Sequence, residues 1–152
     1  MTYEIKIIPA KESTKSINLI STNEDSQSGM TANAISNVEF KVDSIEEDLK
    51  DRSGNVRVML KIEGQISEET SEMCNAMLEW SKLGSSEDVY RKVILTIKTT
   101  AGKLLRKYII PLMFVEDYFE KYDSENTGMY TLKLIQQKGH LKDIETECTS
   151  QE

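Results

Sequence analysis

Few side chains of this sequence can perform nucleophilic, acid–base or metal chemistry. The chain contains one histidine, His140, and two cysteines, Cys74 and Cys148. Zinc motifs such as HExxH need two histidines, and the cysteines are too far apart for a CxxC pair. We therefore interpret His140 as an exposed, unengaged side chain, Cys74 as a buried inert thiol and Cys148 as an incidental thiol.

Five carboxylates cluster in the sequence, at Glu116, Asp117, Glu120, Asp123 and Glu125. Paired carboxylates can hydrolyse glycosides, and several oxygens at set spacings can bind calcium. The sequence from Asp123 to Gly128 resembles the start of an EF-hand loop, but Leu134 stands where that loop needs its final glutamate. GxSxG, GxGxxG and GxxxxGK motifs are absent from the sequence. A solvated charge run is the favoured interpretation, and we expect no catalytic residue, metal or cofactor.

Composition bounds the class of protein. The chain has 152 residues, a net charge of -7 and 38% hydrophobic residues, as expected for one acidic globular domain. The acidic balance argues against a general nucleic-acid surface and against docking on anionic membranes. The first residues lack the basic start and apolar run of a signal peptide, so we expect a cytoplasmic protein, at least until it assembles.

Alternating apolar and polar residues predict a strand-rich chain. The predicted strands are centred on Tyr3–Ile7, Ile17–Leu19, Val38–Val42, Val56–Gln65, Val93–Ile97, Lys103–Ile110 and Tyr130–Leu134. Turns are expected at 51–55, 100–102 and 123–128. Pro111 is expected to end its strand, and the segment Leu112–Tyr122 is predicted to be a short helical turn or a corner between sheets.

Two segments lack a core pattern. Residues 21–37 contain no aromatic side chain and one branched aliphatic, Ile35, so we predict a mobile loop that could order against a partner. Residues 139–152 are polar and mostly acidic, which predicts a frayed tail. The expected organisation is a single domain over 1–138 followed by this tail.

One helix is predicted between the strands. Met73, Met77 and Trp80 recur at i, i+4 and i+7, an apolar stripe that we interpret as core packing and not as a ligand site. The predicted N-cap is Ser67, with two glutamates following it in the first turn. Gly84 is the expected C′ residue. Strands joined by turns, with one flanking α-helix, predict a mainly β antiparallel barrel or two-sheet sandwich.

The second half of the chain is similar to a known family. The helix with Trp80 is followed by Tyr90-Arg91-Lys92-Val93, then by the run Arg106–Glu120, which contains Pro-x-x-Phe-Val-x-Asp-Tyr, then by Gly128–Lys138. This order resembles the tube proteins of contractile injection systems, namely phage tail tubes and the type VI secretion tube protein Hcp. The resemblance covers roughly half of the chain.

The resemblance implies a β-barrel or sandwich whose copies form homohexameric rings that stack into a tube. Sheath, baseplate or cargo proteins are then the expected partners, and no residue is catalytic. Phe114, Val115 and Tyr118 would fix the corner that sets subunit geometry. Met73, Met77 and Trp80 would seat the helix on the barrel. The acidic surplus could line the channel, and the 21–37 loop could order on a neighbouring ring.

Two other classes of function stay open at this stage. A non-catalytic β-sandwich module could grip a peptide or another assembly protein at a sheet edge or an apolar patch. An enzyme would need a deep pocket holding Glu116, Asp117 and a lysine with perturbed pKa values.

Overall fold

The computed structural model describes residues 1–22, 29–44, 56–84 and 87–149. The strands are β1 (Thr2–Ile8), β2 (Ile17–Ile20), β3 (Asn37–Ser44), β4 (Val56–Ile66), β5 (Arg91–Lys98), β6 (Leu104–Tyr122), β7 (Gly128–Gln136) and β8 (Glu145–Cys148). The helix α2 (Ser71–Ser81) and the 3-10 turns η2 (Glu87–Val89) and η3 (Leu141–Asp143) complete the described elements. The prediction of a mainly β fold with a flanking helix is confirmed.

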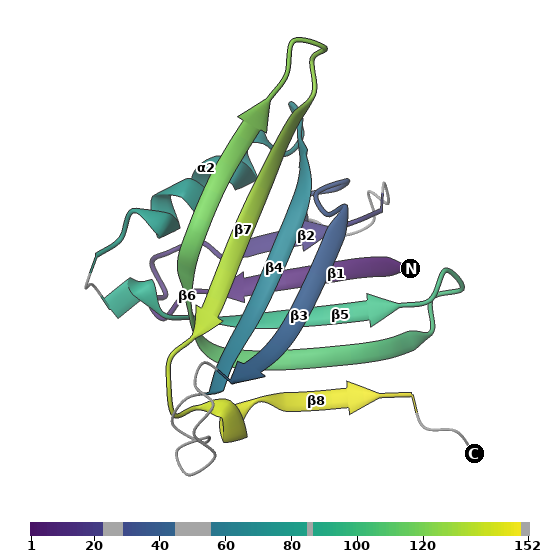
Figure 1. Ribbon diagram of the computed structural model, residues 1–152. Helices are drawn as coiled ribbons and strands as arrows, with labels where there is room; N and C mark the ends of the chain where they lie inside the picture. Colours follow the sequence, from purple (N-terminus) through teal and green to yellow (C-terminus); the bar gives the residue numbers. More distant parts are fainter. Residues whose placement is uncertain (23–28, 45–55, 85–86, 150–152) are drawn as a thin grey trace.

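The strands form two layers that share β6. Neighbouring strands follow the order β2-β1-β5-β6-β7-β4-β3, and β8 also pairs with β6. The first part of β6 pairs with β5 and β8, and its second part pairs with β7. In Figure 1, β2, β1 and β5 run across the view, whereas β7, β4 and β3 cross them steeply. We call the two layers the first sheet (β2, β1, β5, start of β6, β8) and the second sheet (end of β6, β7, β4, β3).

Of the two predicted architectures, a barrel and a two-sheet sandwich, the chain adopts the sandwich. The ends of the strand order, β2 and β3, do not pair with each other in the described part of the chain, so the sheet does not close into a barrel. The two layers contact through their inner faces, where the rings of Phe40 and Tyr108 stack at 4.4 Å. Alternation supplies the core, because the inward residues Ile5, Leu60 and Leu132 are fully buried.

The corner lies inside β6, and the prediction that Pro111 ends its strand is wrong. The β5–β6 register shifts between Arg91 and Val93, opposite Pro111, and Leu112 takes a positive φ of 59°. A proline cannot donate to a sheet ladder, but a register irregularity leaves room for one. The strand therefore bends and continues, and 112–122 is a corner followed by strand instead of a helical turn. The N–H of Gln137 holds the bend by donating to the Leu112 carbonyl at 2.8 Å.

The helix begins later than predicted. Its N-cap is Thr70, whose hydroxyl accepts from the Ser67 N–H at 2.8 Å and donates to the Gln65 carbonyl at 2.9 Å. Because this fully buried hydroxyl ties the turn to the end of β4, Ser67 belongs to the turn and not to the cap. The expected role of Gly84 is also wrong: Lys82 caps the C-terminus in the right-handed region, and Gly84 has no positive φ.

Both segments without a core pattern contribute backbone to the sheets. Part of the predicted 21–37 loop, residues 23–28, lies outside the described residues. The expectation of an unpacked segment is wrong for its other end, because Ala34 and Ile35 are buried and the Ala34 N–H donates to the Ile20 carbonyl at 2.9 Å. The expected frayed tail forms β8, which pairs with Arg106–Ile109, although all four of its side chains are exposed. Backbone pairing of this kind leaves no hydrophobic pattern in the sequence.

The close approach of Ala34 and Tyr130 to β4 requires a glycine at position 64. A Cβ on Gly64 of β4 would lie 2.1 Å from the Ala34 carbonyl oxygen and 2.7 Å from the ring of Tyr130. The Tyr130 hydroxyl donates to that same carbonyl in the buried interior. In the described residues, no helix is long and apolar enough to cross a membrane.

Candidate assembly surfaces

The predicted stripe of α2 lies in the core. Met73, Met77 and Trp80 are 5%, 0% and 2% exposed, and they belong to the main hydrophobic cluster. The Trp80 indole N–H donates to the Val89 carbonyl at 2.9 Å. These contacts agree with the core-packing interpretation of the stripe. The role of these side chains in assembly would be indirect, through the position of α2.

A buried ion pair joins η2 to the start of β5, and the sequence pattern did not predict it. The Arg91 guanidinium donates to the Asp88 carboxylate at 3.1 Å and lies 4.9 Å from the centre of the Trp80 ring. Thr14 adds a hydrogen bond to the same carboxylate oxygen at 3.0 Å, while the other oxygen, Asp88 Oδ1, is buried and has no partner among the described residues. Burial lowers the pKa of Arg91, and the Asp88 charge opposes that shift. The spacing of three residues between the partners is the only sequence signal that could have indicated this pair.

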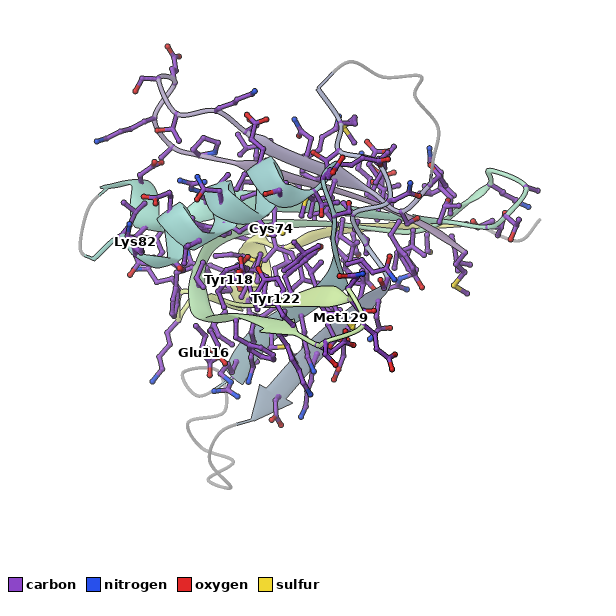
Figure 2. All side chains as sticks on the ribbon, turned by 90° about the horizontal axis from the view of Figure 1, so that it is seen from above. Cys74, Lys82, Glu116, Tyr118, Tyr122 and Met129 are labelled. Atoms are coloured by element: carbon purple, nitrogen blue, oxygen red, sulfur yellow. The ribbon has the colours of Figure 1, made fainter. Side chains whose placement is uncertain are left out.

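Tyr118 lies between β6 and the helix, and the exposed Tyr122 shares its partner Glu120. The Tyr118 hydroxyl is within hydrogen-bond reach of the Cys74 carbonyl oxygen of α2 at 3.3 Å and of the Glu120 carboxylate at 2.7 Å (Figure 2). Tyr122 donates to the other Glu120 oxygen at 2.7 Å. Burial, followed by the hydrogen bond to Glu120, raises the pKa of Tyr118. Cys74 is buried, as predicted, and burial raises the pKa of its thiol to about 11, which disfavours the reactive thiolate.

The three residues predicted at the corner do not form one cluster. Val115 and Tyr118 pack against the core. Phe114 pairs across the sheet with Ile135, on the other face, and meets the edge of the Tyr90 ring at 5.9 Å. One stretch of β6 therefore serves two surfaces, the interior and the outer face of the second sheet.

Ion pairs cover the middle of this outer face. The Glu116 carboxylate lies 3.8 Å from Arg57 and 3.7 Å from Lys133, and Lys61 lies 3.0 Å from Glu63. The hydrogen bond with Glu63 raises the pKa of Lys61. Exposed pairs of this kind contribute little to stability, typically about 0–1 kcal/mol each. Because acids and bases alternate here, this face does not carry the acidic surplus of the chain.

Two of the side chains considered for catalysis or metal binding, Asp123 and His140, make hydrogen bonds within the chain. Asp123 accepts hydrogen bonds from the N–H groups of Glu125 and Thr127 at 2.9 and 3.0 Å, which closes the β6–β7 turn. His140 is not unengaged as predicted, because its Nδ1 lies 2.9 Å from Asp143. Over the described ranges, no group of three or more His, Cys, Asp and Glu side chains is arranged to hold a metal ion.

The sheet edges differ in how they are covered. The outer side of β2 is occupied by the chain at 31–34, where the Ile20 N–H donates to the Thr31 carbonyl at 2.9 Å. Among the described residues, the outer sides of β3 and β8 carry no further strand. An uncovered strand edge is a template for pairing with another chain.

Comparison with known proteins identifies the fold. No family model and no curated protein matches the sequence. Solved structures do match: Hcp1 from Flavobacterium johnsoniae superposes with a TM-score of 0.53 at 13% identity, over 98% of this chain and 97% of that one. This chain has the tube-protein fold.

Other structures with this fold extend the comparison. Hcp1 from Salmonella typhimurium gives a TM-score of 0.54 at 14% identity, over 88% of this chain and 81% of that one. A chain of the anti-feeding prophage baseplate gives 0.53 at 10% identity, over 98% and 94%. Within the tube-protein fold of this chain, the Pro-x-x-Phe-Val-x-Asp-Tyr run that indicated the resemblance is the bend of β6.

Proposed function

We propose that this protein is a structural subunit of a tube of the contractile-injection type, in which copies join into rings and the rings stack. The observation that carries the proposal is the likeness of fold to tube and baseplate chains over nearly the whole length of this chain. A hexameric ring is the form that the resemblance implies. The place of action would be an assembled particle, with sheath, baseplate or cap proteins as further partners.

The uncovered edges supply a means of ring closure. The outer edges of β3 and β8 are different surfaces of one molecule, so contact between them is head-to-tail. Such heterologous contacts form a closed ring when the rotation between neighbours closes. Closure would also cover the strand edges that a free subunit exposes.

The test begins with the mass and shape of the purified chain. Light scattering after size exclusion, with negative-stain images of the same peak, is expected to find rings or tubes of one diameter. A compact monomer at every concentration, also in the presence of preformed tubes of this protein's own system, would contradict the proposal. That outcome would favour the alternative of a binding module that grips a peptide or another assembly protein.

A strand-edge variant tests ring closure directly. Thr146→Pro and Glu147→Pro each remove one backbone donor from β8, and their side chains are exposed, so the core is untouched. Because successive N–H groups of a strand point to opposite sides, one variant loses a donor of the outer edge and is expected to stay folded and lose rings, whereas the other loses a donor that faces β6. Thr146→Ala is the matched control, since it keeps the backbone donor. Rings of normal yield in both proline variants would contradict a role for β8.

A further inference from the structure

The outer face of the second sheet is apolar at both ends. At one end lies the β6–β7 turn, with Phe119 and Met129 beside it on this face and Tyr122 on the opposite face, which it shares with Glu120; we call these three side chains the hairpin tip. At the other end lies a groove lined by Val56, Phe114 and Ile135; we call this the distal groove. The strand register places them apart, because Tyr122 pairs with Gly128 at the tip and Phe114 pairs with Ile135 at the groove. Gly128 and Ile135 are seven positions apart along β7, a separation of roughly 23 Å at the rise of a strand.

The hairpin tip presents apolar side chains on a rigid support. Phe119, Tyr122 and Met129 are 49%, 64% and 40% exposed. The turn between the strands is closed by Asp123, and the Tyr122 ring is held by Glu120. In Figure 1 the β6–β7 hairpin projects past the other strands. A rigid projection loses little conformational entropy when it binds, which favours its use as a contact.

The distal groove is a hollow of about 360 Å³, close to the lower size of ligand-binding clefts. Its apolar floor is fixed: the Tyr90 ring supports Phe114, and the Gln136 amide donates to the Pro111 carbonyl at 3.0 Å. Arg57, Glu116 and Lys138 stand around it. The groove therefore offers an apolar floor within a charged rim, a pattern typical of protein contact sites.

The two ends are complementary in charge. The tip carries the carboxylates of Glu120, Asp123 and Glu125 against one lysine, Lys121. Among the described residues that line the groove, the charged ones are two cations, Arg57 and Lys138, and one carboxylate, Glu116. An acidic tip and a basic rim attract each other, and this attraction favours a second copy of the chain as the occupant over an apolar peptide without charge.

We propose that the hairpin tip of one copy inserts into the distal groove of the next copy. Because tip and groove are different surfaces at opposite ends of one sheet, the contact repeats along a line and does not close between two copies. Resting on the proposed function, this is the contact that joins successive rings. It is separate from the β3 and β8 edges, which join copies within a ring.

The test uses two complementary variants. The tip variant Phe119→Ser/Tyr122→Ser/Met129→Ser keeps the groove, and the groove variant Arg57→Glu/Lys138→Glu keeps the tip. We expect each variant alone to form rings of normal diameter that stack roughly 30-fold more weakly, the effect of losing one interface hot spot. A mixture of the two variants is expected to form paired rings, because one intact tip still meets one intact groove.

The control and the contrary outcomes are distinct. Lys92→Glu/Lys103→Glu changes the net charge as the groove variant does, at exposed positions in β5 and in the turn that follows it, and should stack normally. Circular dichroism should give the same melting curve for the three variants and the wild type, since the altered side chains lie outside the core. Variants that stack like the wild type would overturn the inference while leaving the proposed function intact. Wild-type rings that never stack would overturn both the inference and the stacking part of the proposed function.

If the wild type forms no rings, a further measurement distinguishes the ring proposal from the tip–groove contact. Sedimentation velocity would then report whether monomers associate end to end with rising concentration. Association that the tip and groove variants abolish would support the contact although the ring proposal fails. No association at any concentration would overturn both.

Discussion

The underside of α2 and the hairpin tip use the same side-chain types in opposite ways. Met77 is fully buried under the helix, whereas Met129 at the tip is 40% exposed. Tyr118 is hydrogen-bonded between β6 and the helix, whereas Tyr122, four residues further along β6, is 64% exposed. The first region already has its partner within the chain. The second region has a shaped apolar surface that no described residue covers, which is the form expected of an assembly contact.

The largest expected effect of a substitution is under the helix. Trp80→Ala removes a buried indole, its hydrogen bond to the Val89 carbonyl and the ring beneath Arg91, and should lower the free energy of unfolding by about 3–5 kcal/mol. Urea unfolding measures this loss. Leu78→Ala, on the exposed side of the same helix, is the control and should change stability by no more than about 0.5 kcal/mol. A Trp80→Ala variant as stable as the wild type would mean that the helix is not seated as described.

The same substitution, methionine to alanine, is expected to change stability by different amounts in the two regions. Met77→Ala leaves a cavity in the core and should cost about 2–5 kcal/mol, whereas Met129→Ala should stay within about 0.5 kcal/mol. Thermal and urea unfolding of both variants provide the comparison. Equal losses at the two positions would show that the tip is covered within the monomer, and the stacking contact would then lose its basis.

Removal of a tyrosine hydroxyl is expected to lower stability at Tyr118 and not at Tyr122. Tyr118→Phe removes a hydroxyl that lies against α2 and should cost about 1 kcal/mol. Tyr122→Phe removes an exposed hydroxyl and should leave the monomer unchanged in urea unfolding. Values that match at the two positions, or a larger loss for Tyr122→Phe, would contradict the assignment of Tyr118 to the interior.

The smallest expected effect is a pH dependence from Cys74. Burial raises the pKa of this thiol from 9.0 to about 11, so between these values the unfolded chain loses the proton first. The stabilisation is complete below pH 9 and is lost as the pH rises towards 11. Urea unfolding at pH 8, 9 and 10 should therefore find a decline that is smaller in Cys74→Ala. Identical slopes in the two proteins would contradict this origin.

Much of the fold could be predicted because it follows from alternation. The period of two in Val56–Gln65 and Tyr130–Leu134 marks strands with one buried face, and the stripe at Met73, Met77 and Trp80 marks a buried helix face. These patterns depend on local geometry and on the hydrophobic effect, so the sequence carries them directly. The motif around Phe114 and Tyr118 also carried the resemblance that the fold comparison supports.

The tertiary structure decided what depends on partners distant in sequence. Pro111 sits inside a strand because the neighbouring register shifts there, and the tail becomes β8 because β6 offers an unpaired side. The buried pair of Asp88 and Arg91 needs the Trp80 ring above it. The hairpin tip and the distal groove lie at opposite ends of one sheet only once β6, β7 and β4 are in register. Backbone hydrogen bonds and surface shape arise from this pairing, and the order of residue types alone does not encode them in a readable pattern.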